Sequence, residues 1–215
     1  MSPALIAALP FLGALLPGLL IRTGRTACAT VTGFVTLLAL IGLGLHIPAV
    51  LRGEVIQARI DWLPALGLNV SFFIDGLGLL FAGLILGIGL LVILYARFYL
   101  SPRDPMGQFY TYLMLFQGAM VGIVLSDNIL LLLVFWELTS LSSFLLIGFW
   151  QHKAEARQGA RMALAVTGGG GLALIGGMVL LGVVAGSFDL ATILERGDIV
   201  RASPFYPAML GLILI

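Results

Sequence analysis

Long stretches without a charged residue constrain this chain more than any other feature. Asp, Glu, Lys and Arg are absent from residues 1–21, 26–51, 76–96, 105–126 and 162–188. An α-helix rises 1.5 Å per residue, so about 20 apolar residues cross the roughly 30 Å of hydrocarbon in a bilayer. Residues 128–152 form one more such window, interrupted by a single acid, Glu137. The pattern therefore predicts six membrane-spanning helices.

The composition excludes most soluble classes. Charged residues make up 10% of the 215 residues and the mean hydropathy is +1.14, whereas soluble proteins carry about 25% charged residues. A net charge of +1 leaves no basic excess for binding DNA or RNA. The single cysteine, Cys28, excludes a disulfide framework and a cysteine-based metal site. Because His46 and His152 also lie far apart, we expect neither a metal nor a cofactor.

We expect a single, all-α domain over residues 1–215, a polytopic transmembrane helix bundle. Residues 51–74 are treated as a loop. The last uncharged run, residues 202–215, is too short to cross a bilayer as a helix. We therefore expect a truncated chain that stops inside a seventh span. The predicted helices cover residues 2–21, 27–50, 75–99, 105–125, 127–150, 160–186 and 204–215.

Loop charges predict the orientation of the bundle. The loops after the second, fourth and sixth spans contain four cations and most of the acids. The loops after the first, third and fifth spans contain seven cations: Arg22, Arg25, Arg97, Arg103, Lys153, Arg157 and Arg161. Loops rich in Lys and Arg face the cytoplasm. We therefore expect a protein of the cell inner (plasma) membrane with its N-terminus outside.

Glu137 is the candidate functional residue. It lies ten residues into the span predicted from Asp127, about 15 Å along the helix and close to the middle of the bilayer. An acid at that depth costs a few kcal/mol, which protonation or a cationic partner reduces. The functional interpretation is a proton relay, and the alternative is a neutral acid that is hydrogen-bonded for packing. The other predicted mid-span positions hold no Lys or Arg, so a partner would lie beyond Ile215 or on another subunit.

Polar residues around Glu137 allow two interpretations. Thr139, Ser140 and Ser143 could line a hydrated proton path, or their hydroxyls could bond back to the helix backbone and allow close helix packing. Asp75 and Asp127 each start a predicted helix and are interpreted as structural N-caps. The run 168–171 consists of four glycines without the lysine of a phosphate-binding loop, and we interpret it as a packing feature or a flexible point.

These motifs resemble one family of membrane subunits. Residues 126–149 are similar to the fifth helix of the proton-channel subunits shared by respiratory complex I and the Mrp-type multisubunit cation/proton antiporters. Residues 73–77 resemble the start of the third helix in that family, and residues 95–97 resemble its end. The sequence of residues 136–143 is similar to the corresponding sequence in the large A subunit of the Mrp antiporters. Glycines 168 and 171 stand where the complex I subunit is expected to carry an Arg and an Asp, which favours the antiporter group.

The resemblance implies a function and a site. It implies proton translocation coupled to Na⁺ efflux by a secondary transporter subunit, not an enzyme, within a multisubunit complex and without a cofactor. The fold would be the front part of an inverted-repeat transporter with a broken seventh helix. Glu137 would be the acid of a Glu–Lys pair whose lysine lies just past Ile215, and Asp75 would be structural. Two alternatives stay open: a proton-pumping subunit of a complex I-like NADH:quinone oxidoreductase, and a membrane scaffold that transports nothing.

Overall fold

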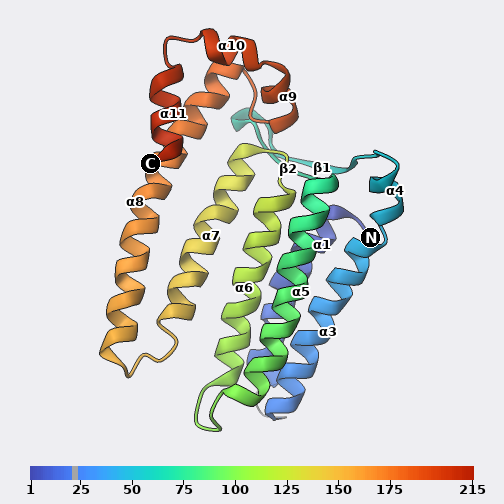
Figure 1. Cartoon of the computed structure of the whole chain (residues 1–215), viewed down its shortest axis with the longest axis vertical. Coiled ribbons are helices and arrows are strands. Elements are labelled where there is room, and N and C mark those ends of the chain that lie inside the picture. Colours follow the sequence, from blue (N-terminus) through green and yellow to red (C-terminus); the bar gives the residue numbers. More distant parts are fainter. Residues whose placement is uncertain (21–23) are drawn as a thin grey trace.

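The computed structural model describes residues 1–20 and 24–215; Arg22 and the expected end of the first span lie outside the described residues. Helices α1 (Pro3–Ala14), α2 (Leu16–Leu20), α3 (Arg25–Gly44), α5 (Gly76–Tyr99), α6 (Met106–Leu125), α7 (Ile129–Ile147) and α8 (Ala154–Ala185) form an upright bundle (Figure 1). Six candidate spans are long and apolar enough to cross a membrane: Pro3–Leu20, Arg25–Leu51, Gly76–Tyr99, Met106–Leu125, Ile129–Ile147 and Ala154–Ala185. The prediction of a six-span helical bundle is confirmed.

Prolines divide the first two spans. α1 stops after Ala14 and α2 contains Pro17, whereas α3 stops after Gly44 and the short helix α4 (Ile47–Leu51) has Pro48 in its first turn. Proline has no N–H to donate and its ring crowds the preceding turn, so it fits best in the first turn of a helix, as Pro17 and Pro48 do in α2 and α4, although α1 runs through Pro10. The segments predicted as single helices over 2–21 and 27–50 are therefore each made of two pieces.

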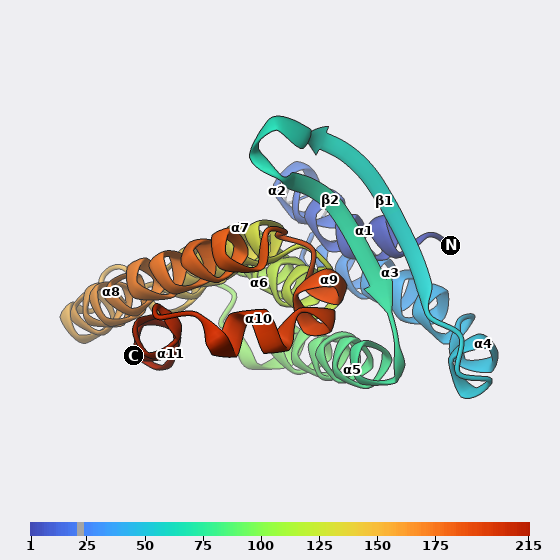
Figure 2. The ribbon, with the colours of Figure 1, turned by 90° about the horizontal axis from the view of Figure 1, so that it is seen from above.

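A β-hairpin occupies much of the segment that is predicted as a loop. Strands β1 (Ile56–Leu63) and β2 (Leu68–Ile74) pair antiparallel, with a register shift between Asp61 and Leu63 and a 3₁₀ turn η2 (Pro64–Leu66) between them. The hairpin lies across the end of the bundle, over α1 and α3 (Figure 2). Along β2 the side chains at 69, 71, 72 and 74 are buried against the helix ends. The hairpin thus closes the bundle end at which α7 begins.

The last third of the chain stands to one side of the bundle. α8 packs against α7, and α11 (Tyr206–Leu214) packs against α8 (Figures 1 and 2). Two short helices, α9 (Leu190–Glu195) and α10 (Gly197–Ala202), connect α8 to α11. α8 begins at Ala154, earlier than the predicted residue 160, because its first turns continue past the apolar window and carry Arg157 and Arg161.

Three apolar clusters hold these parts together. The largest, which includes Ile6, Leu43 and Leu125, joins α1, α3, α5 and α6 beneath the hairpin. A second, which includes Tyr110 and Phe149, lies where α5, α6 and the end of α7 meet. The third joins the start of α7 to the end of α8 and to α9–α11 through Ile129, Ala185, Ile193, Val200 and Met209. Burial of this kind contributes about 25 cal/mol per Å² of apolar surface, so this cluster anchors the end of α8 to the start of α7.

Candidate functional site

Asn128 fixes the start of α7. Its side-chain oxygen accepts hydrogen bonds from the backbone N–H groups of Leu130 at 3.1 Å and Leu131 at 3.2 Å, which makes it the N-cap. Its amide nitrogen donates to the carbonyl of Gly67 in the hairpin turn and to the Asp189 carboxylate, both at 2.9 Å. The fully buried Asn128 therefore ties the start of α7 to the hairpin and to the segment before α9.

The prediction that Asp127 caps this helix is wrong. Its carboxylate accepts a hydrogen bond from the Ser71 hydroxyl at 3.2 Å, and its backbone N–H donates to the Ser71 carbonyl at 2.9 Å. Asp127 is thus hydrogen-bonded to strand β2, and the next residue, Asn128, is the N-cap of α7. Asp75, in contrast, is the N-cap of α5, because its carboxylate accepts from the N–H of Gly78 at 2.7 Å. Both acids lie at the hairpin end, away from the middle of α7.

Glu137 lies near the midpoint of the 19-residue helix α7. Its side chain points toward α8, where a Cβ atom built at Gly171 would overlap Glu137 Oε1. This oxygen is buried and has no hydrogen-bond partner among the residues that the structure describes. A buried polar atom without a partner is uncommon in a folded protein, so this oxygen marks the carboxylate as a candidate functional group.

The hydroxyl groups after Glu137 donate to their own helix. Thr139 Oγ1 donates to the Trp136 carbonyl at 2.6 Å, and Ser140 Oγ contacts the same carbonyl at 3.4 Å. Ser142 donates to the carbonyl of Leu138 at 2.6 Å. A hydroxyl oxygen that donates its proton to the backbone still has lone pairs with which it can accept a hydrogen bond. The hydroxyls of Thr139 and Ser140 are therefore acceptors toward the space between α7 and α8.

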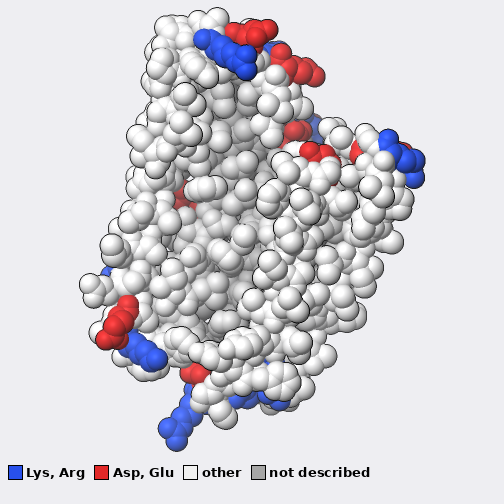
Figure 3. Space-filling view, in the orientation of Figure 1, with Lys and Arg blue, Asp and Glu red and all other residues white. Residues whose placement is uncertain are grey.

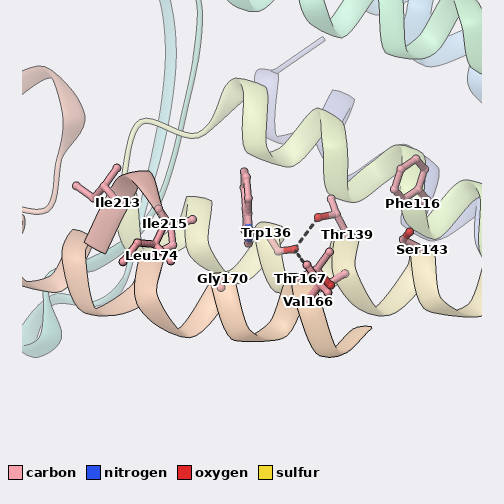
Figure 4. Close-up of a pocket in the computed structure, with 12 residues that line it drawn as sticks. Phe116, Trp136, Thr139, Ser143, Val166, Thr167, Gly170, Leu174, Ile213 and Ile215 are labelled. Atoms are coloured by element: carbon pink, nitrogen blue, oxygen red, sulfur yellow. Dashed lines mark hydrogen bonds between the residues drawn. The ribbon is translucent and has the colours of Figure 1, made fainter. Parts of the chain in front are cut away.

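A cavity of about 390 Å³ occupies that space (Figure 4). Ile213, Ile215 and Leu174 lie at one end of it, and Phe116 and Ser143 lie toward the other. Since one water needs only about 15 Å³ of free volume and a few polar partners, the cavity can hold several. The polar and glycine residues that line it are Thr139, Ser140, Ser143, Thr167, Gly170 and Gly171.

The structure places the predicted site residues in two groups. Thr139, Ser140 and Ser143 line the cavity together. Glu137 does not line the cavity itself. It contacts Gly171, and Gly171 is one of the residues that line the cavity. The interpretation of glycines 168–171 as a packing feature or a flexible point misses this contact, since a periodic pattern does not reveal which residue of a neighbouring helix faces Glu137.

Charged residues other than Glu137 gather at the two ends of the molecule (Figure 3). The ion pairs within the described ranges, 1–20 and 24–215, join Arg52 to Glu54 and Arg59 to Asp61 and Asp189 at the hairpin end. Hydrogen bonds to the two aspartates raise the pKa of Arg59, and the hydrogen bond from Arg52 lowers the pKa of Glu54. Over the same ranges the structure holds no group of three or more His, Cys, Asp and Glu side chains suited to a metal ion.

Two family models match the chain. Residues 126–215 match the NADH:quinone oxidoreductase/Mrp antiporter transmembrane family, and residues 62–110 match the N-terminus of chain 5 of NADH-ubiquinone oxidoreductase (complex I). The first match contains α7, α8 and α11, the helices around Glu137 and the cavity. The second contains the hairpin turn, β2 and α5.

Similar proteins include antiporter subunits. A probable A/B subunit of a K⁺/H⁺ antiporter from Rhizobium meliloti is 46% identical over 207 residues, which cover 96% of this chain and 21% of that protein. The A subunit of a Na⁺/H⁺ antiporter from Alkalihalophilus pseudofirmus is 50% identical over 164 residues, which cover 75% of this chain and 20% of that protein. The chain therefore spans about a fifth of the length of these relatives.

Solved structures agree with this fold. One protein of the Mrp complex from Dietzia sp. DQ12-45-1b matches 99% of this chain with a TM-score of 0.84 and 32% identity, and the match covers 23% of that protein. One protein of the membrane-bound sulfane sulfur reductase, an archaeal respiratory membrane complex, matches with a TM-score of 0.80 at 22% identity, which is a likeness of fold alone. The arrangement of α1–α11 is therefore that of a longer membrane subunit.

Proposed function

The chain belongs to the family of antiporter-like membrane subunits found in Mrp antiporters and NADH:quinone oxidoreductases, and on that premise we propose that it forms part of the large A subunit of a multisubunit monovalent cation/proton antiporter. In this proposal protons cross the membrane in exchange for Na⁺ or K⁺, and the other subunits of the complex are its partners. The relatives that cover most of this chain are named as Na⁺/H⁺ and K⁺/H⁺ antiporter subunits, which supports exchange of a monovalent cation.

The observation that carries the proposal is the carboxylate of Glu137, held at the middle of α7 with a buried oxygen that has no donor within the described chain. Apolar surroundings favour the protonated form of such a group, and an approaching cation favours the ionised form. In the proposed step, Glu137 releases its proton when a cation moves toward it and takes up a proton when that cation withdraws. That dependence is what a coupled transport step requires.

We assign the cationic partner to a lysine in the segment that follows Ile215. α11 packs along α8, with Ile213 against Gly177, and Ile215 lines the cavity. A helix continuing in this direction would pass the level of Gly171 and Glu137. In the assigned arrangement α11 and its continuation have two positions. In one of them the lysine lies near the carboxylate of Glu137, and in the other the lysine is withdrawn from it.

We assign the proton path to the hydroxyl-lined cavity. Thr139, Ser140 and Ser143 face it from α7, and Thr167 faces it from α8. Waters that donate to these hydroxyls would form a chain that ends next to Gly171, beside the carboxylate. The protein would lie in the plasma membrane with its N-terminus outside. Most of its Lys and Arg residues lie in the loops at the bundle end away from the N-terminus, and loops rich in Lys and Arg face the cytoplasm.

A redox-driven pump is the second candidate. The match of residues 62–110 to a complex I chain favours it. The identity of 46–50% to antiporter subunits favours exchange, because it extends over 96% of the chain in one relative. A scaffold without transport is the weakest candidate, since it gives no reason for an acid in the middle of α7.

The test replaces Glu137 by Gln in the full-length subunit within the complete complex. Exchange is measured in inverted membrane vesicles as the collapse of a proton gradient after addition of NaCl or KCl. We expect a fall of about a hundredfold or more, the size typical of losing a positioned proton-transfer group. The matched control is Glu155→Gln, an exposed acid in the first turn of α8, which should exchange at the wild-type rate. Wild-type exchange by Glu137→Gln, with normal assembly, would overturn the proposal.

A further inference from the structure

The four glycines of α8 differ in what a side chain would meet. A Cβ atom built at Gly168, Gly169 or Gly170 would have nothing within 4 Å. A Cβ atom at Gly171 would overlap Oε1 of Glu137 and would lie 3.4 Å from Cδ and 3.7 Å from Oε2 of the same carboxylate. Of these four positions, therefore, Gly171 is the one at which the missing methyl group makes room for a side chain of α7.

Packing against α8, and not a hydrogen bond of Oε1 to a described residue, positions the carboxylate of Glu137. Oε1 makes no hydrogen bond to any described residue, and the Ser140 hydroxyl on the same face of α7 is directed to the Trp136 carbonyl. The glycine backbone of α8 is thus the surface against which the buried oxygen rests. A methyl group there would take up the volume that Oε1 fills.

The elements packed on α7 bring no ionic partner to this level. α6 and β2 contain no Asp, Glu, Lys or Arg, and the titratable side chains of α6 are Tyr110, which donates to the Ile93 carbonyl, and Tyr112. The charged residues of α8 are confined to its first turns: Glu155, Arg157 and Arg161. Within the described chain, the position of the carboxylate therefore depends on packing against α8.

We propose that Gly171 is a positioning residue for Glu137. Its lack of a side chain lets the carboxylate lie between α7 and α8 at the edge of the hydroxyl-lined cavity. The inference rests on the proposed function, because it assigns Gly171 a role in the same proton step. An alanine at this position displaces the carboxylate from α8, which changes both the rate of exchange and the pH range over which it runs.

The experiment compares Gly171→Ala with Gly169→Ala in the full-length complex. Both changes improve the helix propensity of α8 by a similar amount, and the space at Gly169 is open, so Gly169→Ala controls for effects on the helix itself. We expect exchange by Gly171→Ala to fall about tenfold, since a displacement of about 1 Å can cost up to a hundredfold. We also expect its pH profile to shift, while Gly169→Ala keeps the wild-type rate and profile.

A compensating variant separates positioning from general disruption. Glu137→Asp shortens the side chain by one methylene, about 1.5 Å, and by itself withdraws the carboxylate from Gly171. In the double variant Glu137→Asp with Gly171→Ala, the shorter acid leaves room for the methyl group. We expect the double variant to exchange faster than the product of the two single effects predicts, which is the signature of a direct contact.

The outcomes distinguish the two claims. If Gly171→Ala matches Gly169→Ala in rate and pH profile while Glu137→Gln abolishes exchange, the positioning role is overturned and the transport function stands. If Glu137→Gln exchanges normally, the function falls and the positioning role falls with it. Additive effects in the double variant would also overturn the positioning role.

Discussion

The N-cap of α7 and the acid at its middle have opposite hydrogen-bonding states. Asn128 is fully buried, and its side chain makes four hydrogen bonds, two to the backbone of α7, one to Gly67 and one to Asp189. Glu137 has a buried oxygen with no partner inside the described chain. Buried polar groups in folded proteins are nearly always satisfied. Asn128 therefore accounts for the position of the helix. Buried atoms without a partner among the described residues are Arg25 Nε, Asn69 Oδ1 and Glu137 Oε1, and of these Glu137 Oε1 is the one at the middle of a membrane-spanning helix.

The same distinction holds elsewhere in the bundle interior. Gln117 of α6 is 3% exposed, and its side-chain oxygen accepts a hydrogen bond from Thr36 of α3 at 3.3 Å while its amide donates to the Ile85 carbonyl of α5. These bonds connect three helices, and both the oxygen and the nitrogen of the amide have a partner within the bundle. A polar residue in a span is thus not by itself a transport residue.

The residues of the site were predictable to different degrees. Glu137 can be found from the sequence, because one acid inside a long apolar window has few structural explanations. The cap of α7 cannot, because Asp and Asn are equally good caps and only the contact of Asp127 with Ser71 in β2 assigns the cap to Asn128. The contact with Gly171 depends on how α8 is rotated against α7, which the sequence of either helix leaves open.

The hairpin is the element that the sequence-based prediction misses. Its signal was present, since apolar residues alternate with polar ones over Ile56, Ala58, Ile60 and Trp62, as is typical of a strand. The charged residues between them made the segment look like an ordinary loop between spans. Proline favours the helix breaks at Pro17 and Pro48, but it does not locate them alone, because α1 runs through Pro10.

Gly67 packs the hairpin turn against Phe188, in the segment that follows α8, and supports a prediction about stability. It has φ +70° in the turn, and a Cβ there would lie 2.6 Å from Cδ2 of Phe188. Gly53 has φ +80° with nothing within 4 Å. Gly53→Ala should therefore cost only the backbone strain, about 1 kcal/mol. Gly67→Ala should cost roughly 1–3 kcal/mol more, because the ring must move.

The thermal stability of the purified full-length subunit tests this prediction. The melting temperature of Gly67→Ala should be clearly lower than that of Gly53→Ala when both are measured in the same detergent. Equal decreases would mean that the contact between the hairpin turn and Phe188 contributes nothing beyond the turn itself.

The whole molecule carries its charges unevenly between its two ends (Figure 3). The hairpin end holds most of the acids, among them Glu54, Asp61 and Asp189. The opposite end, where α5 meets α6 and α7 meets α8, holds mostly cations, among them Arg103, Lys153 and Arg157. Such an excess of Lys and Arg in short loops favours the cytoplasmic side, so the proposed orientation places the hairpin outside.

Single cysteines report this orientation. Glu54 and His152 are both exposed and lie at opposite ends of the bundle, whereas Cys28 is buried. In a full-length subunit without other cysteines, a membrane-impermeant maleimide added to intact cells should label Glu54→Cys. It should label His152→Cys only after the membrane is opened. The reverse pattern would place the N-terminus in the cytoplasm.

The central claim is that Glu137 gains and loses a proton while the complex exchanges ions. Infrared difference spectra of the reconstituted full-length complex, recorded against pH for wild type and Glu137→Gln, measure this directly through the C=O stretch of a protonated carboxyl group. We expect a band that depends on Glu137, grows as the pH falls through the range of exchange, and weakens when Na⁺ or K⁺ is added. Spectra of the two proteins that superimpose throughout that range would contradict it.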